Sequence, residues 1–338
     1  MSIGSNVNKK ILKTFIYKRI EIDDPNKTVS GKTLQDLLLT SLKKLISPDS
    51  RSEKINDDSD LRRAIGHHKE SRGVLCGQVM MFEEGTDIAV LVKDPTTQLF
   101  DVTPVPVGGT EDGKKREVLQ GALFFAVQAN HMVILQSQAV TFKALELHIN
   151  WLLKECSKTM DTSAHIILNN EPTEAAMRAI SDGGFRSFKI GSPVIRDDLE
   201  AETIEIKDAS SVKTHFFANG VDVLKSMLKG AWSDELDIPD GADLSNLKVT
   251  VEVKYNRYKH ESDSDARKWL DQLARASRHF DPEDTVIETA SGKTITGNEL
   301  RLKERRHVIV HNGIIDRSSA YDELIHWLKD ILAEGKAG

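Results

Sequence analysis

The chain has few cysteines and no long apolar run, and both absences limit the cellular compartments in which we expect the protein. Its 338 residues include two cysteines, Cys76 and Cys156, far apart in the sequence. Small disulfide-stabilised domains carry many more, so this content favours a reducing compartment. No stretch of about 18 apolar residues is present to cross a bilayer, and the first residues lack the apolar core of a signal peptide. We therefore expect a cytoplasmic protein that does not span a membrane.

The chain also lacks an excess of positive charge. It has 46 Lys and Arg residues against 52 Asp and Glu residues, a formal net charge of -6 and a pI near 6.0. Such a balance gives no overall attraction to nucleic acid, so any basic binding surface has to be local. With 39% apolar and 29% charged residues, the composition indicates a soluble globular protein. Its length favours two domains, each with its own core.

Apolar periodicity predicts two α+β domains, at 1–157 and 162–338, built from antiparallel hairpins with packed helices. The first contains amphipathic helices over 33–46, with Thr33 as the N-cap, and over 141–156, and we expect them on one face of the sheet. In the second, short strands and helices follow one another, and "LKVTVEVKYNRYK", which begins at Leu247, is the clearest strand.

The segment "LKERRHVIVHNGIID", residues 302–316, carries the candidate catalytic residues. Arg306 and His311 are spaced as Arg-x4-His, which resembles the motif of the HEPN ribonucleases, enzymes that cut RNA as dimers without metal. In that family the motif lies on a helix. Here Val308 and Val310 alternate with other residues, which predicts a strand whose odd spacing sends Arg306 and His311 to opposite faces. Because Arg and His can form an acid-base pair on any scaffold, a metal-independent ribonuclease is kept as the alternative.

Cations between 254 and 306 predict a phosphate-binding surface. A helix predicted over 263–280 places Arg267, Arg275 and Arg278 on one side, beside cations of the neighbouring strands. A local basic surface of this kind gives sequence-independent affinity for a nucleic-acid backbone. The other interpretation is a solvated charged face on which acidic residues alternate with the cations. The predicted DNA-binding residues are Lys254, Arg257, Lys259, Arg267, Lys268, Arg275, Arg278, Arg301, Lys303 and Arg305.

Other short motifs do not predict a cofactor or a metal site. The "SGKT" segments at 30–33 and 291–294 lack the first glycine of a phosphate-binding loop and are interpreted as turns. The adjacent histidines His67 and His68 point apart on a helix or a strand, so they do not ligate one metal without further residues. We expect no cofactor.

The order of the predicted elements resembles that of the RexA exclusion proteins of lambdoid phages. The segments that carry this resemblance are "LKVTVEVKYNRYK", the predicted hairpin "DTVIETASGKTITGNELRLKE", whose return strand continues into 302–316, and the terminal helix "SSAYDELIHWLKDIL". Members of that family are dimeric DNA-binding factors that work with a membrane protein. The resemblance implies a non-enzymatic, sequence-independent DNA-binding homodimer in phage exclusion or antiviral defence, with a possible membrane-protein partner. The loops at 47–60 and 106–115 and the basic helix depart from the family pattern.

Overall fold

A computed structural model gives the structure of the protein as two units. Unit 1 comprises Met1–Glu171 and Arg301–Gly338, and unit 2 comprises Pro172–Leu300. This division differs from the expected domains, because the C-terminal segment pairs with the N-terminal strand rather than with unit 2. The residues that the structure describes are 8–56, 59–85, 87–93, 100–105, 107, 116–183, 185–193, 248–254 and 285–335.

Unit 1 is built around one antiparallel sheet, which confirms the α+β class. The strand order is β15-β14-β1-β8-β7-β4-β3-β2, and β9 also pairs with β1. A separate antiparallel pair is formed by β5 (Ile88–Lys93) and β6 (Phe100–Val105). The strands of the large sheet are β1 (Asn8–Asp23), β2 (Ser52–Lys54), β3 (Leu61–Ser71), β4 (Val74–Glu83), β7 (Val118–Gln128), β8 (His131–Leu135), β9 (His165–Asn170), β14 (Lys303–His311) and β15 (Ile314–Ile315).

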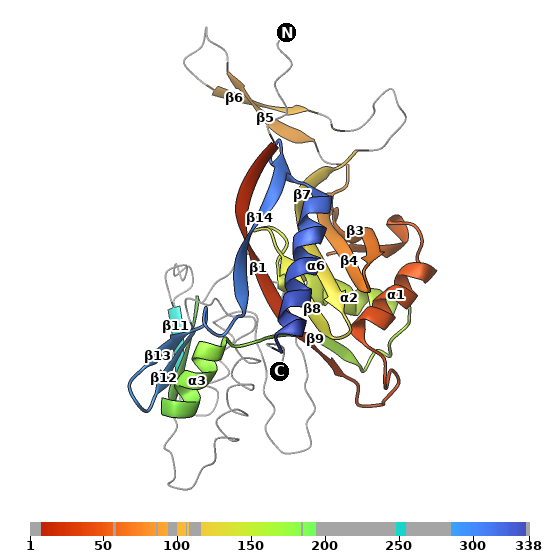
Figure 1. Cartoon of the computed structure of the whole chain (residues 1–338). Coiled ribbons are helices and arrows are strands. Elements are labelled where there is room, and N and C mark those ends of the chain that lie inside the picture. The colour runs from red at the N-terminus through yellow and green to blue at the C-terminus, as the bar shows by residue number, and fades with distance from the viewer. Residues whose placement is uncertain are drawn as a thin grey trace, which may run out of the picture. The chain divides into compact units, whose positions relative to one another are not determined.

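Helices cover both faces of this sheet (Figure 1). On one face lie α1 (Leu34–Lys44) and α2 (Phe142–Trp151), the latter continued by the π-helical turn η2 (Leu152–Cys156). On the other face lies α6 (Arg317–Ala333), so the two helices predicted over 33–46 and 141–156 share one face, as expected, and the terminal helix covers the other. Two-sided burial is visible in β4, where the residues from Val74 to Val79 are all buried. Among the described helices, none is long and apolar enough to cross a membrane.

Local sequence explains two of the closest contacts in unit 1. The predicted N-cap of α1 is confirmed: Thr33 accepts a hydrogen bond from Asp36 N, and the Asp36 carboxylate accepts from Thr33 N at 3.0 Å. In β4, Gly77 lies against the ring of Phe125 on the neighbouring strand β7, so closely that a Cβ atom at Gly77 overlaps the ring. A larger residue at Gly77 therefore requires Phe125 to move.

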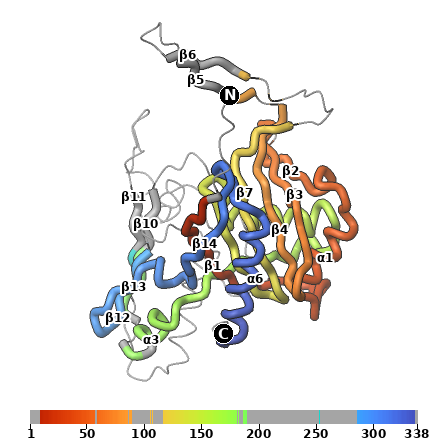
Figure 2. The backbone as a smooth tube through the Cα atoms, turned by 45° about the horizontal axis from the view of Figure 1, so that its top comes forward, coloured from red at the N-terminus to blue at the C-terminus, as the bar shows by residue number. Residues whose placement is uncertain are grey.

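The long strand β1 pairs along one edge with two separate strands. Lys18 faces Asn170 of β9, and two residues earlier Ile16 faces Lys303 of β14. Ile16 also faces Ile134 of β8, which occupies the opposite edge of β1. Since both β9 and β14 run antiparallel to β1 on the same edge, they form the two halves of one composite strand. Figure 2 shows one of these halves, β14, beside β1.

Unit 2 is inserted between these two halves. Tyr17 lies opposite the junction, and its N–H donates to Leu302 O at 2.9 Å. The Leu302 N–H in turn donates to Glu171 O at 2.7 Å, so the chain leaves and re-enters unit 1 at adjacent positions. An insertion with adjacent ends interrupts the composite strand without separating its halves.

Unit 2 contains a small antiparallel sheet and one described helix, α3 (Glu174–Gly183). The strand order is β11-β10-β12-β13, and the predicted strand from Leu247 is confirmed as β11. The hairpin of β12 and β13 turns at Gly292, where φ is 84°. Its expected return strand through 302–316 was wrong, because β14 pairs with β1. The strands are β10 (Phe185–Pro193), β11 (Lys248–Lys254), β12 (Thr285–Thr289) and β13 (Thr294–Thr296).

Candidate nucleic-acid interface

One face of the β1–β14 strand pair is exposed and basic. The register places Arg305 opposite Thr14 and His307 opposite Leu12, so alternate residues of the two strands share this face. The core beneath α1 and α2 takes Ile20 from β1 but no residue of β14, so those helices do not bury this part of the sheet. We call this surface the basic ribbon face; its residues are Lys10, Leu12, Thr14, Lys303, Arg305, His307, Ile309 and His311.

The charges of the basic ribbon face have one sign. Lys10, Lys303 and Arg305 are exposed, and successive same-face residues of a strand are about 6.8 Å apart. Glu304, which separates two of these cations in the sequence, points to the opposite face and faces Phe15 of the core across the ladder. The interleaving of acidic residues seen in the sequence therefore does not carry over to this face, and none of its residues is acidic.

Arg306 lies on the other face of β14 and is surrounded by carboxylates. Its guanidinium nitrogens lie 3.1 Å from Glu304, 3.2 Å from Glu323 and 3.2 Å from Asp330, and its side chain is 15% exposed. Glu323 and Asp330 belong to α6, so this cluster fixes α6 to β14. Arg306 and His311 consequently point to opposite sides of the sheet, as the alternation of the sequence predicts.

His311 ends β14 beside a tight turn. Asn312 and Gly313 have φ values of 50° and 85°, the left-handed pair of a two-residue hairpin that connects β14 to β15. The His311 Nε2 atom lies 3.8 Å from Asp316 Oδ2, and the other carboxylate oxygen, Oδ1, accepts a hydrogen bond from Ser319 N and caps α6. His311 is thus a half-exposed member of the basic ribbon face beside a helix N-terminus.

Of the other predicted DNA-binding residues, Lys254 and Arg301 are described and are not part of β14, and the rest lie outside the described residues. The guanidinium of Arg301 lies 5.7 Å from the ring centroid of Phe142, and Lys18 Nζ lies 3.5 Å from the same centroid. Lys254 ends β11 in unit 2. Two residues of the predicted set, Lys303 and Arg305, lie on the same strand, β14, and on the same face of it. The residues outside the described part of the chain are Arg257, Lys259, Arg267, Lys268, Arg275 and Arg278.

Sequence reasoning missed Lys10 as a member of this surface. The segment "NKKILKT" at the start of β1 alternates, which places Lys10, Leu12 and Thr14 on one face. That signal was readable in the sequence. The sequence does not indicate that this face pairs with the strand of Arg305 and His307, near the other end of the chain.

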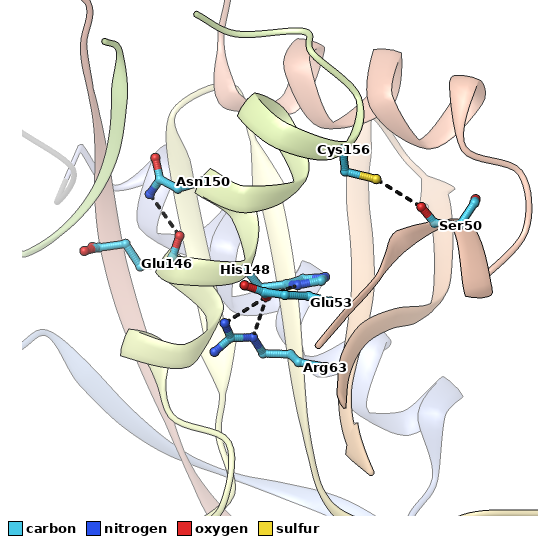
Figure 3. A network of polar contacts seen from close by, with 7 residues as sticks. All are labelled: Ser50, Glu53, Arg63, Glu146, His148, Asn150 and Cys156. Carbon is cyan, nitrogen blue, oxygen red and sulfur yellow. Dashed lines mark hydrogen bonds and ion pairs between the residues drawn. The ribbon is translucent and has the colours of Figure 1, made fainter. Parts of the chain in front are cut away.

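A buried polar network lies elsewhere in unit 1, between α2 and the strands β2 and β3 at one end of the sheet (Figure 3). One carboxylate oxygen of Glu53 accepts hydrogen bonds from Arg63 Nε at 3.0 Å, Arg63 Nη2 at 2.8 Å and His148 Nδ1 at 2.9 Å. The His148 ring is fully buried and stacks on Trp151, with centroids 5.4 Å apart. The Nε2 atom of His148 has no hydrogen-bond partner among the described residues.

The pKa values in this network follow from burial and from the shared carboxylate. Burial lowers the pKa of His148, and this effect outweighs the hydrogen bond and the charge of Glu53, which raise it. For Glu53, burial raises the pKa, but the hydrogen bond from His148 and the charge of Arg63 more than offset it and lower the pKa overall. The arrangement therefore holds a neutral histidine against a carboxylate–guanidinium pair that fixes β2 to α2.

Neighbouring polar contacts shown in Figure 3 are structural in the same way. Asn150 Nδ2 donates to Glu146 O and to Ile166 O, each at 2.9 Å, which joins α2 to β9. Cys156 Sγ lies 3.0 Å from Ser50 O, and burial raises the pKa of its thiol. None of these contacts places a nucleophilic side chain beside a general base.

The remaining candidate groups show no catalytic arrangement. Burial raises the pKa of the Cys76 thiol to about 12, which keeps it protonated. His67 Nδ1 lies 3.1 Å from the hydroxyl of Tyr321 in α6, and burial lowers the pKa of both His67 and His68. Within the described residues, no group of His, Cys, Asp and Glu side chains is arranged to hold a metal ion.

No protein-family model matches the sequence, and no curated protein matches it significantly. The resemblance to the RexA family accordingly stays a prediction from the order of its elements, and function has to be argued from the basic ribbon face.

Proposed function

We propose that the protein binds DNA through the phosphate backbone, without sequence preference and without catalysis, in phage exclusion or a related antiviral defence. The observation that carries this proposal is the basic ribbon face, whose exposed cations Lys10, Lys303 and Arg305 come from two paired strands. Neutralising phosphates releases counterions and provides affinity that does not depend on sequence. The setting, a homodimeric state and a membrane-protein partner are proposed from the element order that resembles RexA-like proteins.

The chemistry of this face favours a duplex backbone over unpaired bases. Proteins that hold single strands without sequence preference combine cations with aromatic side chains on which bases stack. The basic ribbon face contains the aliphatic residues Leu12 and Ile309 and no Phe, Tyr or Trp. Contacts from lysine and arginine to phosphate set position and carry no sequence information. Double-stranded DNA of any sequence is therefore the expected ligand.

The alternative is a metal-independent HEPN-type ribonuclease that uses Arg306 and His311. Such chemistry requires both side chains at one phosphate. Arg306 instead contacts carboxylates of Glu323 and Asp330 on the α6 side of the sheet, whereas His311 lies on the basic ribbon face. This geometry argues for the binding function.

A fluorescence anisotropy titration tests the proposal. Labelled random-sequence duplex DNA is titrated with the full chain at several salt concentrations, and we expect the logarithm of the affinity to fall linearly with the logarithm of the salt concentration. In the double variant Lys10→Glu, Arg305→Glu we expect a loss of affinity, with the slope reduced by about 1 for each phosphate contact removed.

The matched control carries the same charge change elsewhere. Lys43→Glu with Lys69→Glu replaces exposed lysines of α1 and β3 that lie outside the basic ribbon face. Equal binding by the two double variants would contradict the proposed surface. Cleavage of RNA in EDTA that disappears in His311→Ala would instead establish the ribonuclease.

A further inference from the structure

At Arg305 and His307, the edge of β14 that faces away from β1 presents backbone groups without partners among the described residues. Ile309 points to this outer edge, because its N–H donates to Ser319 Oγ at 3.0 Å and its C=O accepts from Asp316 N at 2.8 Å. Backbone direction alternates along a strand, so Arg305 and His307 point the same way. In the described part of the chain, no hydrogen bond engages their outward N–H and C=O groups.

The end of β14 is covered at this edge by β15. Among the described strands, β15 pairs with Val310 and His311 and no further. At the start of β14, the C=O of Leu302 points inward and accepts from Tyr17 N, in agreement with the alternation. From Arg305 to His307, β14 keeps a regular register to β1 on its inner side, and its outer edge is the part available to an added strand among the described residues.

The ligand that fits this edge is another polypeptide strand. Arg305 and His307 each present one donor and one acceptor outward, and an added β-strand offers the matching acceptor and donor at the same spacing. A phosphodiester backbone offers acceptors only, so it leaves the outward carbonyls unsatisfied. The edge therefore selects a peptide, whereas the side chains of the basic ribbon face select negative charge.

The charges define the sequence of that peptide. Side chains of an added strand that lie on the basic ribbon face stand beside Arg305 and His307, so acidic residues at alternate positions are favoured there. A second copy of β14 in antiparallel pairing brings cations of the two copies face to face. Like charges in direct opposition destabilise a strand pair, so the charges disfavour a second copy.

A cavity on the opposite face of β14 lies where an added strand places a side chain that points away from the basic ribbon face. Its volume is about 250 Å³, and it lies between the start of β14 and the second half of α6. Trp327 and Ile331, which are nearly fully buried, form its floor. Glu304, Arg306 and Asp330 stand around it. This space suits one side chain of an added strand. The neighbouring residues of that strand, which are acidic, point to the basic ribbon face instead.

We propose that β14 binds an extended acidic segment of a partner protein by strand addition at its outer edge. The added strand hydrogen-bonds to Arg305 and His307, places carboxylates on the basic ribbon face and inserts one side chain into the cavity beside α6. This recognition uses the same face as DNA binding but is distinguishable from it, because it also requires the backbone N–H groups of β14.

A selection with matched variants tests the strand addition. A display library of short random peptides is selected on the full chain, and the selected peptides are measured by fluorescence anisotropy. We expect sequences with acidic residues at every second position, and weaker binding after scrambling at constant composition. Arg305→Ala and His307→Ala remove side chains alone, whereas Arg305→Pro and His307→Pro also remove the outward N–H, which an edge strand tolerates.

The proline variants separate the edge from the charges. We expect each proline variant to bind the selected peptides at least tenfold more weakly than the alanine variant at the same position, while both bind duplex DNA equally. Amide hydrogen exchange of the wild type provides a second measurement, with slower exchange expected at Arg305 and His307 when peptide is bound. Peptides without alternation, equal binding by alanine and proline variants, or protection elsewhere would overturn strand addition. So would self-association of the chain through β14. Failure of DNA binding alone would leave it intact.

Discussion

Replacing Glu53 by alanine should destabilise unit 1 more than any exposed charge change. The Glu53 carboxylate contacts both Arg63 and His148, and the side chains of Glu53 and Arg63 are 13% and 6% exposed. The substitution leaves the Arg63 guanidinium buried without a counter-charge. It also removes the acceptor of His148 Nδ1–H, whose ring is fully buried.

The magnitude follows from the burial of both partners. Removing one member of a buried ion pair costs about 3 to 5 kcal/mol, because the other charge stays desolvated. In a unit of this size, each kcal/mol shifts the melting temperature by about 2 to 4 °C, so the expected decrease is about 6 to 20 °C. An exposed pair such as Arg178 and Glu174, with 78% and 58% exposure, contributes at most about 0.5 kcal/mol.

Thermal unfolding followed by circular dichroism measures this difference. The control is Glu174→Ala, which removes the exposed pair in α3. A second variant, Glu53→Leu with Arg63→Met, removes both charges and should recover much of the stability, since a buried pair is often replaceable by apolar residues. A difference of 2 °C corresponds to about 1 kcal/mol at the lower end of this range. If Glu53→Ala melts within about 2 °C of the wild type, the network contributes little to stability and this reasoning fails.

Two further predictions follow from the same structure. Because burial lowers the pKa of His148 below its ordinary value of 6.5, the unfolded chain binds a proton first on acidification, so stability should fall as the pH drops below about 6.5; urea midpoints between pH 5 and 8 should show this decline in the wild type and a flatter profile in His148→Gln. Deleting residues 171–301 and joining Asn170 to Leu302 should leave unit 1 folded, because β9 and β14 then form one continuous strand opposite β1; a deletion variant without a cooperative thermal transition would contradict the composite strand.

Local patterns in the sequence predict individual elements, and their partners come from elsewhere in the chain. The N-cap at Thr33 and the alternation of Val308 and Val310 are local, and both predictions are confirmed. The pairing of β14 with β1 joins the two ends of the chain, and alternation says which residues share a face without saying which strand lies beside them. For the same reason the return strand was assigned to the wrong hairpin.

The candidate site was predictable to a similar extent. The shared face of Arg305, His307 and His311 follows from period two, and the structure has the same grouping. Lys10 shares this face because β1 pairs with β14, and the local pattern does not predict that pairing. The helix predicted to carry Arg267, Arg275 and Arg278 lies outside the described residues, so that part of the predicted surface stays a prediction.

The apolar residues of β14 decide which of two adjacent arginines is available to a ligand. Val308 and Val310 are 0% and 8% exposed and pack under α6, which fixes the register of the strand. Arg306 shares their face and meets Glu323 and Asp330, whereas Arg305 is left on the solvent side. A slip of one residue would exchange the two arginines. The Arg-x4-His spacing therefore describes two side chains that the core separates, and the binding surface is a consequence of core packing.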